Sequence, residues 1–134
     1  MDTQPNIEDI SSMLAPGQVW HYRTRAGEES STVIINRIES APNYDQIFHI
    51  TIQGLNIPTP ETGESITQID HAPVSLPTLL TSLTDLVETT DPCPAGEQGY
   101  QTWKAEFDQN KAGVFLISIA DIVSVIERSF YRLQ

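Results

Sequence analysis

The chain has 134 residues, of which 39% are hydrophobic, and this fits one domain with a single core. Its 18 Asp and Glu outnumber 7 Lys and Arg, so the net charge of −11 disfavours binding to nucleic-acid phosphates. A single cysteine excludes an internal disulfide framework, and no apolar run is long enough to cross a membrane. The acidic start lacks the features of a signal peptide, so we expect a cytoplasmic protein.

Alternating apolar and polar residues predict strands in the first half of the chain. The expected strands cover residues 18–24, 31–38, 46–53 and 65–71. The first two form a hairpin, and Gly27 in its turn can adopt the positive φ that such turns need. In the fourth, Ile66 and Ile69 do not share a face of a regular strand, which indicates a bulge.

Helical periodicity then replaces the alternation. An apolar stripe predicts a helix over residues 76–87, with Ser75 as its N-cap and Pro77 in its first turn. The stripe consists of Leu76, Leu79, Leu80, Leu83, Leu86 and Val87. A second helix is expected over residues 96–110, with Gly113 as its C-cap. Its aromatic face carries Tyr100, Trp103 and Phe107.

The remaining segments complete the expected fold. Residues 114–117 are all apolar and predict a short central strand, and Ser118 opens a capping box for a last helix. A short helix is expected near residues 7–14. The predicted order is β-β-β-β-α-α-β-α, an α+β domain with a mainly antiparallel sheet and helices packed on one face. We expect a single domain over residues 17–134, preceded by a loosely packed segment, residues 1–16.

The charge is distributed unevenly along the chain. No Lys or Arg occurs in the 66 residues between Arg37 and Lys104, and the nine acids there supply −9 of the net charge. Such carboxylates repel one another, which favours a surface that meets a basic protein partner; the alternative is a role in solubility alone. The residues expected to bind this partner are Glu61, Glu64, Asp85, Glu88, Asp91 and Glu97.

The turn of the first predicted hairpin holds the densest polar cluster. Guanidinium groups match carboxylates or phosphates, and the acids of the turn offer acceptors, so one interpretation is a recognition site. The other is ion pairing across the turn, which contributes little at a surface. The cluster consists of Arg23, Arg25, Glu28 and Glu29.

Short catalytic motifs for nucleotide binding, zinc proteolysis, α/β-hydrolase chemistry and dithiol redox chemistry are absent from the sequence. His21, His49 and His71 fall on predicted strands, where they either pack singly or converge, but their spacing matches no metal site. Cys93 lies between two prolines with acidic neighbours, which disfavours a reactive thiolate. We therefore predict no catalytic residue, no metal ligand and no cofactor.

Residues 17–29 read Gly-Gln-Val-Trp-His-Tyr-Arg-Thr-Arg-Ala-Gly-Glu-Glu. This stretch resembles the opening of a family of small bacterial proteins of unknown function that share the pattern G-Q-V-W-x-Y-x-T-R-x-G-E-E. Residues 99–103 and 112–115 are similar to the same family, and the likeness covers most of residues 16–127. The resemblance implies a bacterial origin and no particular activity.

Together these patterns favour a non-enzymatic domain that binds a basic protein through its acidic surface. Its sharpest form is an immunity-type or inhibitor protein that covers the positively charged active site of its target. The alternative is a small-molecule-binding protein or an enzyme of unassigned reaction, using the aromatic face of the second helix and the Arg/Glu turn. A third possibility is a structural subunit of a larger assembly.

Overall fold

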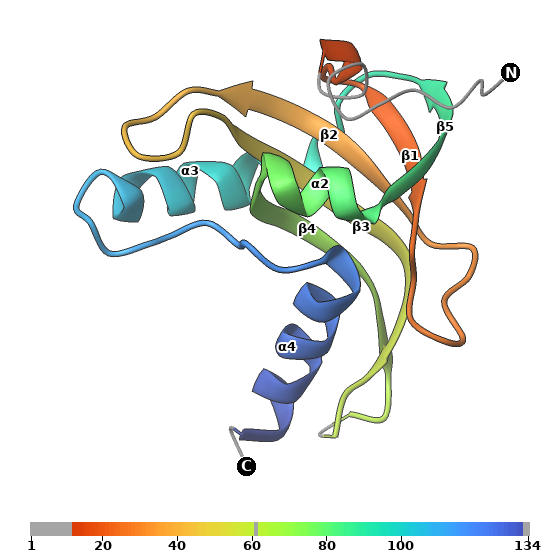
Figure 1. Ribbon diagram of the computed structural model, residues 1–134. Helices are drawn as coiled ribbons and strands as arrows, with labels where there is room; N and C mark the ends of the chain where they lie inside the picture. Colours follow the sequence, from red (N-terminus) through yellow and green to blue (C-terminus); the bar gives the residue numbers. More distant parts are fainter. Residues whose placement is uncertain (1–11, 61, 133–134) are drawn as a thin grey trace, which may run out of the picture.

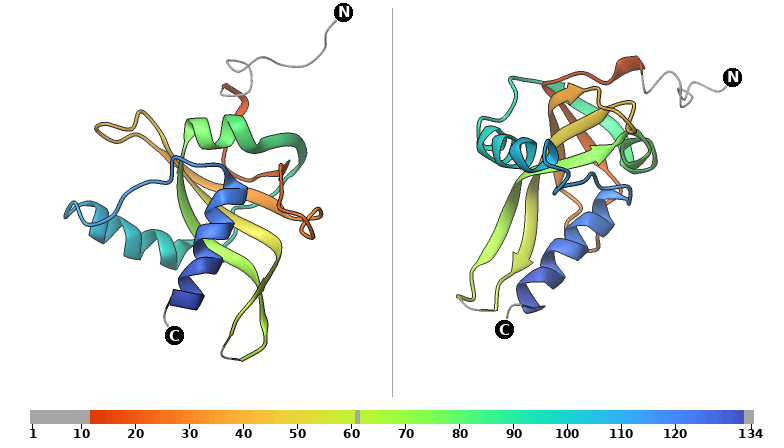
Figure 2. Two further views of the ribbon diagram at one scale, coloured as in Figure 1. Left: turned by 60° about the horizontal axis from the view of Figure 1, so that its bottom comes forward. Right: turned by 90° about the vertical axis from the view of Figure 1, so that its left-hand side faces the viewer.

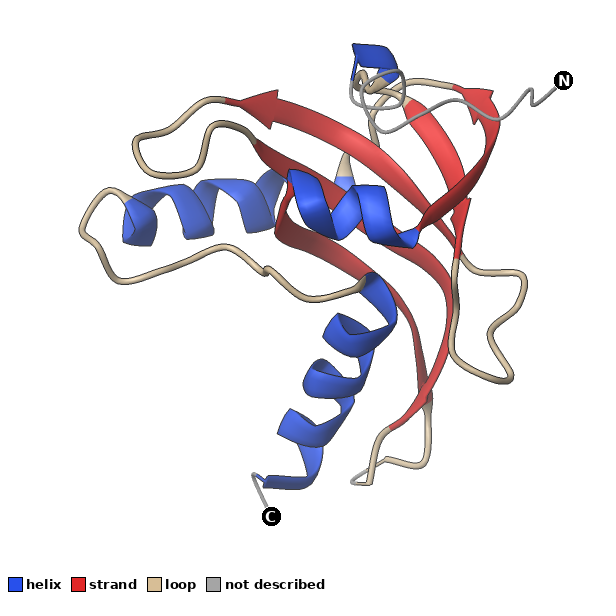
Figure 3. Cartoon of the chain, in the orientation of Figure 1, coloured by secondary structure: helices blue, strands red, loops and turns tan. Residues whose placement is uncertain are grey.

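The structure is a computed structural model that describes residues 12–60 and 62–132 (Figure 1). Strands dominate the first half of the chain and helices the second, as Figure 3 shows. In chain order the elements are β1 (Gln18–Tyr22), β2 (Thr32–Glu39), β3 (Ile47–Pro58), β4 (Ser65–Ser75), α2 (Leu76–Ser82), β5 (Leu83–Thr89), α3 (Ala95–Phe107) and α4 (Ile119–Arg132).

These strands form one antiparallel sheet in the order β4-β3-β2-β1-β5, which confirms the α+β class. The first hairpin is confirmed: Trp20 lies opposite Val33, and Gly27 in the turn has a φ of 89°. Shifts of register between β3 and β4 confirm the irregular fourth strand. Because β5 pairs with β1, it forms one edge of the sheet, and β4 forms the other.

Different helices cover the two faces of the sheet (Figure 2). Alternation along β3 separates the faces, since Phe48 and Ile50 pack with α2 and α4, whereas Ile47 packs against Tyr100 and Trp103 of α3. We expected all helices on one face. The structure places α3 on the other, where it covers polar strand residues such as His49 that are themselves buried.

The helix predicted over residues 76–87 is only half formed. Ser75 caps α2 as expected, its hydroxyl accepting the N–H of Thr78 at 3.3 Å, and Pro77 lies in the first turn. At Leu83, however, the chain becomes extended and continues as β5, with Leu86 opposite Trp20 of β1. The stripe has helical spacing, but a shift of register against β1 allows Leu83 and Leu86 to lie in a strand, and pairing with the open side of β1 decides the outcome.

The close approach of β5 to the start of β1 depends on a glycine. The carbonyl oxygen of Gly17 accepts the N–H of Thr90 at 2.7 Å, and Gly17 has a φ of 92°. A Cβ at this position would overlap the carbonyl oxygen of Thr90. Glycine therefore allows both the left-handed backbone and the contact that anchors the end of β5.

The second predicted helix is confirmed as α3, with Tyr100 and Trp103 buried, but it ends differently. Asn110, with a φ of 60°, takes the left-handed position that we expected of Gly113. The N–H of Lys111 bonds to Glu106 O at 2.9 Å, and that of Asn110 bonds to Phe107 O at 2.9 Å. This is the Schellman pattern, in which asparagine can replace glycine.

Residues 114–117 do not form the central strand that we predicted. Phe115 makes a single parallel bridge to Val74 at the end of β4, and Leu116 is 69% exposed. The expected cap of α4 is present, since the hydroxyl of Ser118 accepts the N–H of Asp121 at 3.1 Å. Most of the short helix predicted near residues 7–14 lies outside the described residues.

Candidate functional site

The six acids that we expected to bind a partner fall into two groups. Asp85 and Glu88 lie on β5, Asp91 follows it, and Glu97 is in the first turn of α3. Glu64 lies in the turn between β3 and β4, and its neighbour Glu61 lies outside the described residues. This turn and β5 are at distant ends of the molecule in every view, so the six do not form one surface (Figures 1 and 2).

Three acids of the first group and the two apolar residues between them form a surface that we call the acidic edge. It consists of Asp85, Leu86, Val87, Glu88 and Asp91. All five side chains are exposed, and Leu86 and Val87 retain 42% and 44% of their accessible surface. Among the described residues none of these three acids forms an ion pair. The acidic edge thus combines unpaired carboxylates with two adjacent apolar side chains.

Glu97 differs from the acids of the edge because it has partners. Its carboxylate accepts from Gln101 at 2.8 Å and pairs with Arg37 at 3.5 Å. The hydrogen bond from Gln101 and the charge of Arg37 lower the pKa of Glu97. Arg37 also stacks on the ring of Tyr100, with its guanidinium carbon 4.1 Å from the ring centroid. Unlike the acids of the acidic edge, Glu97 therefore has an ion-pair partner within the domain.

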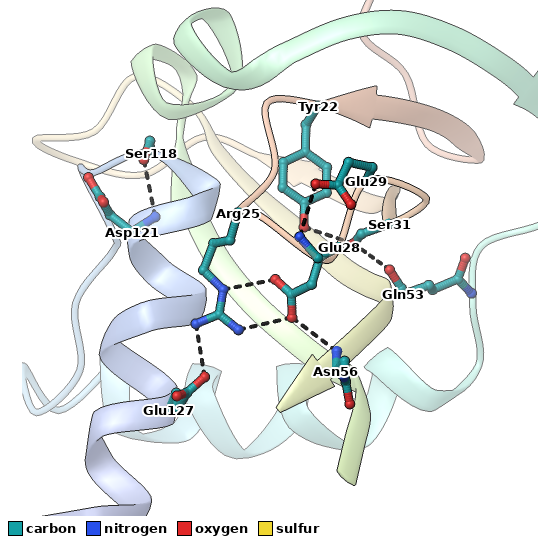
Figure 4. A network of polar contacts seen from close by, with 11 residues as sticks. Tyr22, Arg25, Glu28, Glu29, Ser31, Gln53, Asn56, Ser118, Asp121 and Glu127 are labelled. Carbon is teal, nitrogen blue, oxygen red and sulfur yellow. Dashed lines mark hydrogen bonds and ion pairs between the residues drawn. The ribbon is translucent and has the colours of Figure 1, made fainter. Parts of the chain in front are cut away.

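Two residues of the predicted recognition turn, Arg25 and Glu28, are bonded to each other within the domain (Figure 4), whereas the other two are exposed. Arg25 forms a fork on Glu28, with Nε 2.8 Å from Oε1 and Nη2 2.9 Å from Oε2. Its third nitrogen reaches Glu127 on α4 at 2.9 Å. For Arg25 and Glu28 the structure therefore contains an ion pair across the turn, which was the alternative interpretation of this cluster. Arg23 and Glu29 remain exposed.

This ion pair is more than a surface contact, because Glu28 is only 3% exposed. The backbone N–H of Asn56 on β3 also donates to Glu28, at 3.0 Å. Burial alone would raise the pKa of Glu28, but the hydrogen bonds from Arg25 and Asn56 and the charge of Arg25 outweigh it and lower the pKa. The turn is thereby fastened to β3 and to α4.

A second buried network lies between α3 and the sheet. His49, 1% exposed, places Nδ1 2.9 Å from Nε2 of His71 and Nε2 2.8 Å from Oε1 of Glu39. The hydroxyl of Tyr100 donates to the other oxygen of Glu39 at 3.2 Å. Tyr100 and Trp103 also pack edge-on against the ring of His49. The network joins β2, β3 and β4 to α3 through polar contacts.

The carboxylate of Glu39 determines the direction of the hydrogen bonds. Because it accepts from His49 Nε2, His49 Nδ1 carries a lone pair and accepts the proton of His71 Nε2. Burial lowers the pKa of His49, although Glu39 acts in the opposite direction. Burial and the neighbouring His49 lower the pKa of His71 to about 4. Both rings are therefore neutral at pH 7.

Two of the three histidines thus converge, while His21 is exposed on β1. Beside them a pocket of about 120 Å³ is lined by Arg37, Cys93 and Tyr100 among others. His49 also lines it, but both ring nitrogens of His49 are already bonded, so this imidazole is not available as a base for the half-buried thiol. Within residues 12–60 and 62–132, no group of three or more His, Cys, Asp or Glu is arranged to hold a metal ion.

A further hollow was not predicted. It is an open depression of about 850 Å³ between the β2–β3 loop and the first turn of α2, and Leu116 borders it. Its lining mixes small polar residues, proline and Tyr44, and none of the predicted site residues contributes to it. The sequence signal in this region was a turn, Ser40 to Asn43, which indicates a loop but not a concave surface.

The structure also separates the two parts of the alternative site. The aromatic face of α3 lies on one side of the sheet, whereas the Arg25–Glu28 pair contacts α4 on the other. Comparisons with protein-family models, curated proteins and solved structures found no match. Among the described helices, none has the length and apolar character to cross a membrane.

Proposed function

We propose that this chain is an interaction domain that binds a basic protein through the acidic edge. The observation that carries the proposal is the exposure of Asp85, Glu88 and Asp91, none of which is neutralised by an ion pair among the described residues. Arg23, which is exposed directly after β1, forms no ion pair with them in the described structure.

Two further features support an interface over simple solubility. Leu86 and Val87 lie between the acids, and apolar contact area gives affinity that charge alone does not supply. Two other acids of the base-free block, Glu39 and Glu97, are by contrast engaged by partners within the domain. An immunity-type or inhibitor protein, which covers the basic active site of a target, is the sharpest form of this proposal.

The test begins with capture of partners from native lysate at low and high salt, followed by kinetics with the purified partner. The triple variant Asp85→Lys, Glu88→Lys, Asp91→Lys should slow association at least tenfold, because steering by charge raises association rates by 10–10³-fold, an order-of-magnitude figure. A matched variant, Asp70→Lys, Glu106→Lys, Asp121→Lys, changes the net charge equally at exposed positions elsewhere. Equal slowing in both variants would contradict a specific surface.

A further inference from the structure

The outer side of β5 is an open strand edge. β5 pairs with β1, and no other described strand lies beyond it. The opposite edge of the sheet is partly covered, because Phe115 bridges Val74 of β4 through two backbone hydrogen bonds of 2.9 and 3.0 Å. Residues 84–89 of β5 are all exposed, and β5 stands free along the sheet margin in Figure 1.

Proteins usually protect such edges with lysine, proline or a covering element, because an open edge pairs with other strands. The sequence of β5, Leu-Thr-Asp-Leu-Val-Glu-Thr, contains neither lysine nor proline. Its β-branched residues, Thr84, Val87 and Thr89, favour an extended backbone. Two shifts of register toward β1 and the charges of Asp85 and Glu88 are the protective features in the described part of this edge.

The charges of β5 select the strand that can pair with it. Two copies of β5 placed edge to edge would bring acids near acids without any base, and like charges opposite one another are destabilising. Residues 1–11 carry Asp2, Glu8 and Asp9 and no Lys or Arg, so that segment is mismatched for the same reason. A segment with alternating basic and apolar residues matches both the carboxylates and Leu86 and Val87.

We infer that the partner binds by strand addition: an extended basic segment pairs with the outer side of β5. Its Lys or Arg side chains meet Asp85 and Glu88, and its apolar side chains cover Leu86 and Val87. Main-chain hydrogen bonds give the affinity, and the side chains give the specificity. The inference rests on the proposed function and adds to it the conformation and chemistry of the bound segment.

The probe is an eight-residue peptide of alternating lysine and valine with blocked ends, titrated into the full chain. We expect it to slow backbone amide exchange within β5, with binding that weakens as salt rises. The matched control has the same sequence with N-methyl groups on alternate residues, made in both registers. One of the two should bind at least tenfold more weakly, because it cannot donate to β5.

The outcomes separate this inference from the proposed function. Equal binding of the peptide and both methylated forms overturns strand addition but leaves a basic ligand on the acidic edge. If cytochrome c, a folded basic protein, binds and the peptide does not, strand addition is likewise overturned, and the acidic edge remains a surface for a basic ligand. Binding that is unchanged in Asp85→Asn, Glu88→Gln overturns the proposed surface itself. Protection, in the free protein, of those β5 amides that are not bonded to β1 shows that another segment or a second copy covers the edge, which also overturns strand addition.

Discussion

Replacing Glu28 by glutamine tests whether the buried ion pair holds the first hairpin to the rest of the domain. The carboxylate accepts two bonds from Arg25, at 2.8 and 2.9 Å, and one from Asn56, at 3.0 Å. Glutamine retains one acceptor oxygen and turns an N–H group toward the donors. Hydrogen bonds to charged groups contribute about 1.5–3 kcal/mol each, and Arg25 is 22% exposed, so solvent screens part of this.

We therefore expect Glu28→Gln to lower the free energy of unfolding by about 2–3 kcal/mol. In a urea titration followed by tryptophan fluorescence, this corresponds to a midpoint lower by about 1–2 M. The neighbouring Glu29→Gln is the control, since Glu29 is exposed and accepts only the N–H of Gly27. Its effect should stay below about 0.5 kcal/mol. A midpoint for Glu28→Gln no lower than that of Glu29→Gln would refute the reasoning.

The remaining predictions concern the packing of α3. Because the folded-state pKa values of His49 and His71 lie below their ordinary value, the unfolded chain binds protons more readily, and stability should fall as the pH drops from about 6.5 toward 4. His71→Phe should flatten this dependence in urea titrations at stepped pH; an unchanged slope argues against the assignment. Gly99→Ala should cost about 1–3 kcal/mol, since its Cβ would lie 2.5 Å from that of His71. Gly113→Ala, with open space around its Cβ, is the control and should cost far less.

Local patterns predicted those parts of the fold that depend on neighbouring residues. Alternation located the first hairpin, and the cap residues Ser75 and Ser118 marked true helix starts. The same local view missed β5, because Leu83 and Leu86 have helical spacing and fit a strand only through the shift of register with which β5 pairs with the open side of β1. Sequence periodicity contains no information about which strands lack a neighbour.

The candidate site shows the same division. The base-free block was visible in the sequence, and it led to the three acids of the acidic edge. The sequence did not show that these three acids lie far from Glu64 in the β3–β4 turn. All four belong to the same base-free block, and only the fold separates them. The buried link from Arg25 to Glu127 was missed for a similar reason, since the two residues are 102 positions apart and no local spacing connects them.

That link also makes the environment of the hairpin turn depend on the last described element of the chain. The strands of the hairpin pair with each other and with β3 and β5, whereas α4 is synthesised after every other described element. Until α4 docks, one donor nitrogen of Arg25 lacks Glu127, and Ser82 lacks the N–H of Ile119 that it accepts at 3.0 Å. A chain interrupted before α4 would thus retain every strand of the described sheet but would lack both of these contacts, so docking of α4 completes the partners of the turn and of the end of α2.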